Sequence, residues 1–144
     1  MNYRQCPARA FDAIETELVG GHVLLTRIRG HATGLMVERR FDQFRAELGG
    51  VCKPVWIVEQ LELTGFDPSA VTAGARWFTA FKDRGGERII SVSQMAAARM
   101  VAATLAFAVH ARLFNCGTLS EAYEQAGLGA VEIRPSLYPL TPRE

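Results

Sequence analysis

The pattern of apolar and polar residues along this chain predicts five strands separated by helices. The strand-like segments are 13–18, 22–28, 54–61, 88–92 and 109–114. The first two flank Gly20 and Gly21, and paired glycines supply the positive φ that a tight hairpin turn requires. The third is almost continuously apolar, as expected of a strand covered on both faces. We therefore expect an N-terminal hairpin followed by buried strands.

Helical spacing dominates the segments between these strands. Apolar residues recur every three or four positions from Val37 to Leu48, and the glycine pair that follows predicts the end of this helix. A second helix is predicted to begin at Asp67 and to end at another glycine pair. Its expected apolar stripe consists of Val71, Gly74, Ala75, Phe78 and Phe81. Two more helices are predicted at 94–108 and 118–125, the last opened by a capping box.

The predicted order of elements is β-β-α-β-α-β-α-β-α. Strands that single helices connect are joined by right-handed crossovers, so the central strands must be parallel and covered by helices. The fold class is α/β, with a mixed, mostly parallel β-sheet covered by about four helices. The 144 residues are expected to form a single domain, with a core at 13–128 and a proline-rich C-terminal arm at 129–144.

Composition and charge narrow the classes of function. Lys and Arg number 16 against 15 Asp and Glu, a formal net charge of +1, and no basic block indicates nucleic-acid binding. No apolar run resembles a signal peptide or a membrane span, so we expect a cytoplasmic protein. Cys6, Cys52 and Cys116 are far apart, which argues against a disulfide framework and a zinc site. No metal or cofactor is expected.

The segment from Leu61 to Val71 is the strongest candidate for a functional site, because it joins the buried strand to a helix. Asp67 is a favoured N-cap, Pro68 suits the first helical position, and Ser69 follows in the first turn. The sequence therefore places a serine hydroxyl near the positive end of a helix dipole, at the carboxyl end of a strand.

The catalytic alternative is a hydrolase triad of Ser69, Asp67 and a histidine. A nucleophilic serine needs a base within hydrogen-bond reach and is usually presented by a Gly-x-Ser-x-Gly elbow, which this chain lacks. His31 is expected in a solvated turn at 30–34, and His22 and His110 in strands. The glycine pairs also lack the spacing of nucleotide-binding loops. We expect no enzymatic activity.

Several segments together resemble a known family. They are the turn Gly-Phe-Asp-Pro-Ser-Ala at 65–70, the Ile-Ile-Ser-Val-Ser strand at 89–93 and the Leu-Ser-Glu-Ala-Tyr helix at 119–123. This succession resembles a STAS domain, the family that contains the bacterial anti-sigma factor antagonists and the SpoIIAA-like and STAS/SEC14-like proteins. The resemblance covers about 23–128.

In the antagonists the turn has an aspartate followed by two hydroxyl residues and a glycine, and a partner kinase phosphorylates the second hydroxyl residue. By position, the aspartate matches Asp67 and the phosphorylated residue matches Ser69, whereas Pro68 and Ala70 depart from the pattern. The resemblance implies a non-catalytic regulatory module that docks an anti-sigma or other signalling protein through these four residues and Thr64. The alternative interpretation is that Asp-Pro-Ser simply makes a good helix start.

The segment 95–109 is apolar on all sides except for Arg99 and Thr104. Such a helix is buried on all sides or faces a partner, another subunit or an apolar ligand, although alanine also tolerates exposure as a strong helix former. The residues expected to make these contacts are Met95, Met100, Leu105 and Phe107. Two alternative functions follow: a SpoIIAA/SEC14-like carrier or sensor of a lipid or other apolar small molecule, and an oligomeric structural subunit such as a homodimer.

Overall fold

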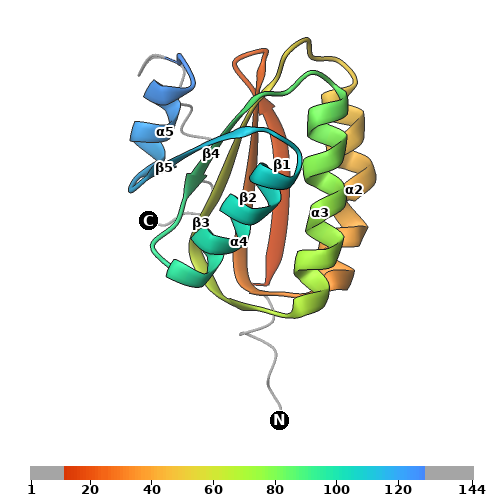
Figure 1. Ribbon diagram of the computed structural model, residues 1–144, viewed down its shortest axis with the longest axis vertical. Helices are drawn as coiled ribbons and strands as arrows, with labels where there is room; N and C mark the ends of the chain where they lie inside the picture. Colours follow the sequence, from red (N-terminus) through yellow and green to blue (C-terminus); the bar gives the residue numbers. More distant parts are fainter. Residues whose placement is uncertain (1–11, 129–144) are drawn as a thin grey trace.

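The structure is a computed structural model that describes residues 12–128. Its centre is a five-stranded sheet with the strand order β1-β2-β3-β4-β5, and helices pack on it (Figure 1). The strands are β1 (Ala13–Val19), β2 (Val23–Ala32), β3 (Val55–Phe66), β4 (Arg88–Val92) and β5 (Arg112–Cys116). The helices are α2 (Gly34–Leu48), α3 (Pro68–Asp83), α4 (Ala96–Ala108) and α5 (Leu119–Gln125).

The pairing of the strands confirms the predicted α/β fold. β1 and β2 are antiparallel, and their hairpin turns at Gly20 and Gly21, whose φ angles are 65° and 87°. The pairs β2–β3, β3–β4 and β4–β5 are parallel. The sheet is therefore mixed and mostly parallel.

Two apolar cores lie on opposite faces of the sheet. Each of α2, α3 and α4 connects neighbouring parallel strands in the same direction across the sheet, and right-handed crossovers then place all three on one face. Their core holds stacked aromatic rings, including Phe44, Trp56 and Trp77. On the other face α5 packs through Tyr123 against residues such as Ile57 and Ile90.

Two strands extend further than the sequence predicts. β2 continues to Ala32 and β3 to Phe66, so the predicted turn at 30–34 and the predicted strand end at Leu61 are wrong. The register between them shifts after Arg27 and again after Gly30. Such bulges interrupt the alternation of apolar and polar residues by which strands are found in a sequence.

The last strand begins later than predicted, at Arg112 in place of Val109. His110 has a φ of 61° and lies in the turn that ends α4, which excludes it from the strand. His22 also lies in a turn, in the first hairpin. Cys116 ends β5 and is buried.

The buried faces of two helices also differ from the predicted ones. In α3 the buried residues are Ala70, Ala73, Trp77, Phe78 and Phe81. In α4 they are only Ala98, Ala102 and Ala106. The predicted helix boundaries are correct to within about three residues, but α4 lies on the sheet through alanines and directs Met100 and Phe107 to solvent.

The predicted C-terminal arm, 129–144, and Cys6 lie outside the described residues. Within residues 12–128, no helix has the length and apolar character that crossing a bilayer would require.

Candidate functional site at the start of α3

The starts of two helices meet at one edge of the sheet. Because β2 and β3 are parallel neighbours, their carboxyl ends lie together, and α2 and α3 leave from there and run side by side (Figure 1). The backbone N–H of Asp67 donates to the carbonyl of Ala32 at 2.9 Å, and this hydrogen bond joins the end of β2 to the start of α3. The predicted site at Asp67 and Ser69 lies at this junction.

The hydroxyl of Ser69 contacts the start of the neighbouring helix. Its Oγ accepts a hydrogen bond from the backbone N–H of Gly34, the first residue of α2, at 3.1 Å. A Cβ at position 34 would lie 2.8 Å from both Cβ and Oγ of Ser69, so only glycine permits this approach. Ser69 is nevertheless exposed. One serine thus stands between the N-termini of α2 and α3.

Asp67 occupies the N-cap position of α3, as predicted, but its side chain makes no capping hydrogen bond. Its Oδ1 is instead 2.7 Å from Nε2 of His31, and each side chain is 48% exposed. The backbone N–H of His31 donates to Oδ1 of Asp12 at 3.1 Å. The carboxylate therefore makes no contact with the helix start, where Pro68 has no N–H and the N–H of Ala70 donates to the carbonyl of Asp67 at 2.9 Å.

The histidine–aspartate pair was not predicted, because His31 was assigned to a solvated turn. It lies near the end of β2, where parallel pairing brings it opposite Gly65. The signal in the sequence was that His31 and Asp67 each follow a predicted strand and precede a predicted helix.

These groups do not form a hydrolase triad. In the described part of the chain no hydrogen bond joins Ser69 to His31, and the Ser69 hydroxyl is bonded to Gly34. His22 and His110 lie in exposed turns. Likewise, no group of three His, Cys, Asp or Glu side chains between residues 12 and 128 is arranged to hold a metal ion.

The other predicted contact residues of this site differ in accessibility. Thr64 and Pro68 are exposed, as Ser69 is, whereas Asp67 is partly exposed. Ala70 is buried at 8% exposure and belongs to the core. A partner that approaches the start of α3 would therefore touch Thr64, Asp67, Pro68 and Ser69 but not Ala70.

The predicted contact residues of α4 separate into two pairs. Met100 and Phe107 are 71% and 80% exposed. Met95 and Leu105 are half-buried and pack against the core, and Leu105 also lines a cavity between α4, α3 and the sheet.

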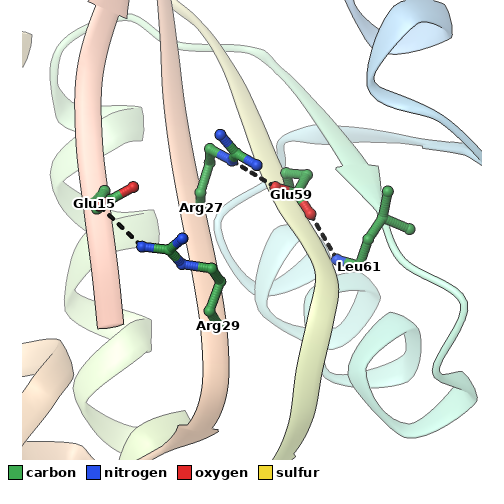
Figure 2. Close-up of polar contacts among 5 residues, drawn as sticks. All are labelled: Glu15, Arg27, Arg29, Glu59 and Leu61. Atoms are coloured by element: carbon green, nitrogen blue, oxygen red, sulfur yellow. Dashed lines mark hydrogen bonds and ion pairs between the residues drawn. The ribbon is translucent and has the colours of Figure 1, made fainter. Parts of the chain in front are cut away.

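A second polar cluster lies on the sheet, on the face that carries α5 (Figure 2). Glu59 is only 3% exposed; its Oε1 lies 2.7 Å from Nε of Arg27, and its Oε2 accepts the backbone N–H of Leu61 at 2.7 Å. Arg29 pairs with Glu15 at 3.0 Å. Glu59 thus holds β3 at the register shift.

Cys116 is a buried thiol with no special activation. Burial, and secondarily the carboxylate of Glu121, raise the pKa of the Cys116 thiol above its usual value. A raised pKa leaves less of the reactive thiolate at neutral pH.

Comparison with known proteins gives structural relatives only. No family model matches the chain, and no curated protein matches its sequence. An uncharacterized protein of the DUF3478 family from Shewanella loihica, described as having a SpoIIAA-like fold, is 14% identical with a TM-score of 0.63; the match covers 79% of this chain and 92% of that one.

Two further relatives are anti-sigma factor antagonist structures. SpoIIAA in its unphosphorylated form is 20% identical with a TM-score of 0.61, over 78% of this chain and 96% of that one. The Bacillus cell fate determinant SpoIIAA in the phosphorylated form is 18% identical with a TM-score of 0.58, over 78% and 98%. These likenesses and the strand order confirm the predicted resemblance at the level of the fold. The protein has the SpoIIAA-like fold of STAS domains.

Proposed function

We propose that this protein is a non-catalytic regulatory module that docks a signalling protein through Thr64, Asp67, Pro68 and Ser69, with Ser69 as a phosphorylation switch. The observation that carries the proposal is the exposed Ser69 hydroxyl between two helix N-termini, bonded to the N–H of Gly34. Two structural relatives, SpoIIAA in its unphosphorylated form and SpoIIAA in its phosphorylated form, support it.

The physical basis is the positive end of each helix dipole. A phosphate adds nearly two negative charges and three acceptor oxygens, and helix N-termini favour anions. The side chain of Asp67 makes no capping hydrogen bond, so it does not compete with a phosphate on Ser69 for the start of α3. The same phosphate would displace the Ser69–Gly34 hydrogen bond and change the charge of the docking surface.

The test is a pull-down from cells of the source organism with wild type, Ser69→Ala and Ser69→Glu as baits. We expect wild type and Ser69→Ala to capture the same partner and Ser69→Glu to lose it. Thr72→Glu is the matched control, because Thr72 is also exposed and lies one turn later on α3. Equal loss with both glutamates would refute a switch specific to Ser69.

Phosphorylation itself needs a separate measurement. Mass spectrometry of the protein isolated from its own cells should find phosphate on Ser69 in a fraction of the molecules. Unmodified Ser69 under every growth condition would leave docking possible and remove the switch. A cytoplasmic location and a bacterial signalling partner belong to this same proposal.

A second candidate function is supported by the cavity beside α4. It would make the protein a carrier or sensor of an apolar small molecule, the alternative that the apolar sequence of α4 suggests. A homodimer through Met100 and Phe107 remains a prediction, and it is tested with the variant of α4 described in the Discussion.

A further inference from the structure

A cavity of about 100 Å³, partly open to solvent, lies between the sheet and helices α3 and α4. Trp56, Trp77 and Phe78 form part of its wall, with side chains of β2, β3, α3 and α4. Protein interiors have few voids larger than a water molecule, and a water molecule needs only about 10–15 Å³ of such volume. The space is therefore several times larger than ordinary packing leaves.

Small residues keep α3 and α4 from filling this space. Ala70 and Gly74 line it from α3, and Ala98 and Ala102 from α4. A Cβ added to Gly74 would meet no atom within 4 Å. Gly74 and other lining residues of the two helices, such as Val101, are partly exposed, so the seam between α3 and α4 is the entrance.

One polar side chain that lines the cavity has a buried atom without a hydrogen-bond partner. Oε1 of Gln60, on β3, is buried and forms no hydrogen bond, and Gln60 lines the cavity. Thr26 also lines it, but its Oγ1 accepts from Nε1 of Trp56 at 2.9 Å. A buried acceptor without a donor costs stability, and a bound donor would remove this cost.

We infer that the cavity binds a small neutral molecule about the size of one aromatic ring, with a hydroxyl or N–H group that donates to Oε1 of Gln60. The cavity residues of the described chain include no charged side chain, so an ion would lose its hydration without compensation. A cavity of about 150 Å³ holds benzene, so a single ring would fill this one of about 100 Å³ and extend into the open seam between α3 and α4, whereas a membrane lipid is far too large. The inference does not rest on docking at Ser69.

Phenol and toluene are matched probes for this site, because they have similar size and only phenol carries a donor. We expect NMR titration of the full chain to show saturable binding, with shifts at Gln60, Gly74 and Val101. Phenol should bind at least about tenfold more tightly than toluene, since a satisfied buried acceptor contributes about that factor.

Two variants test the hydrogen bond to Gln60 and the volume of the cavity separately. Gln60→Leu should remove the preference for phenol. Gly74→Leu should place its side chain in the cavity and abolish binding of both probes, while the amide spectrum stays folded. If Gly74→Leu does not fold, the smaller Gly74→Ala should still weaken both probes severalfold.

Three results would overturn the inference. They are the absence of saturable binding of either probe, unchanged binding in Gly74→Leu or Gly74→Ala, and an unchanged preference for phenol in Gln60→Leu. Loss of partner capture by Ser69→Glu bears only on the docking function, so the two proposals fail independently.

Discussion

At the residue scale, two helical glycines of this protein have opposite surroundings. A Cβ at Gly34 would lie 2.8 Å from Ser69 atoms and 3.0 Å from the Ser69 backbone oxygen, whereas a Cβ at Gly74 would meet nothing within 4 Å. Alanine is intrinsically the better helix former by about 1 kcal/mol. The difference between the two sites is therefore steric.

We predict that Gly34→Ala lowers the free energy of unfolding by about 1–3 kcal/mol, because the overpacked contact must be relieved by moving the backbone. Gly74→Ala is the matched control and should raise it by up to about 1 kcal/mol. Urea unfolding monitored by tryptophan fluorescence measures both. A neutral Gly34→Ala would mean that α2 and α3 separate easily at this junction.

The two ion pairs of Figure 2 should differ in their contribution to stability. The Glu59 side chain is 4% exposed and the Glu15 side chain 52% exposed. We predict that Glu59→Ala costs about 3 kcal/mol or more, because it leaves the charge of Arg27 without this buried partner. Glu15→Ala should cost about 1 kcal/mol or less. Equal costs in chemical denaturation would contradict the role of burial.

Glu17 gives the protein a pH dependence. Partial burial, then the nearby carboxylates of Glu15 and Glu47, raise the pKa of Glu17 above its usual value, and Arg27 opposes them. A raised folded-state pKa means that the folded state holds the proton more tightly than the unfolded state. This contribution is present below the unfolded pKa and is lost as the pH rises through the folded pKa.

We therefore predict that Glu17→Gln raises the free energy of unfolding at pH 7.5, by less than about 1 kcal/mol because the side chain is mostly exposed. At a pH below both pKa values the variant and wild type should be equally stable. Urea unfolding at both pH values tests this, and an equal gain at both would show an effect unrelated to ionisation.

Local rules predicted one half of the candidate site and missed the other. The N-cap position of Asp67 and the helix start at Pro68 follow from the preferences of adjacent residues. The contacts of Asp67 with His31 and of Ser69 with Gly34 join residues 36 and 35 positions apart. Such contacts depend on the register between β2 and β3. This register could not be predicted from the sequence, because it shifts at two bulges.

At the element scale, α4 contacts the sheet differently from α3. α3 buries two phenylalanines and a tryptophan, whereas α4 buries only alanines. The sequence of α4 is apolar all round, so its pattern predicted a helix but did not indicate which side faces the sheet. Small residues lie closest to the sheet, and the bulky Met100 and Phe107 extend outward.

This arrangement predicts contrasting costs for two phenylalanines. Phe107→Lys should change stability by no more than about 0.5 kcal/mol, because the ring is 80% exposed. Phe81→Ala should cost about 3–5 kcal/mol, because Phe81 is fully buried. Thermal unfolding compares the two, and a large loss in Phe107→Lys would mean that α4 packs the other way round.

The same α4 variant tests the predicted homodimer. If copies of the chain meet through Met100 and Phe107, sedimentation velocity should give wild type a larger sedimentation coefficient than Phe107→Lys at equal concentration. A wild type that stays monomeric at every concentration would remove the homodimer.

Element boundaries were harder to predict than element order. Glycine pairs and helical spacing placed α2 and α3 correctly, since both signals are local. β3 was ended five residues early because Glu62, Thr64 and Gly65 follow Leu61 and resemble a turn. These residues extend the strand by pairing with the end of β2, a contact between distant parts of the chain that the segment alone does not indicate.

At the scale of the whole molecule, the fold places the docking site and the cavity next to each other. Ala32 precedes the start of α2, Ala70 follows Ser69, and both line the cavity. A molecule in the cavity would therefore touch the elements that hold Ser69 and Gly34 together. We expect phenol to shift the amide resonances of Gly34 and Ser69 as well, and the Gln60→Leu variant to reduce this shift.

The cavity also determines how the protein should respond to hydrostatic pressure. Unfolding eliminates internal voids, so the unfolded state occupies the smaller volume, by on the order of 20–100 mL/mol for typical proteins. Any part of the space of about 100 Å³ that water does not occupy adds to this difference. Compression should therefore unfold this protein at lower pressure than a Gly74→Leu variant, and a deep-water relative of this chain would benefit from a larger side chain at position 74.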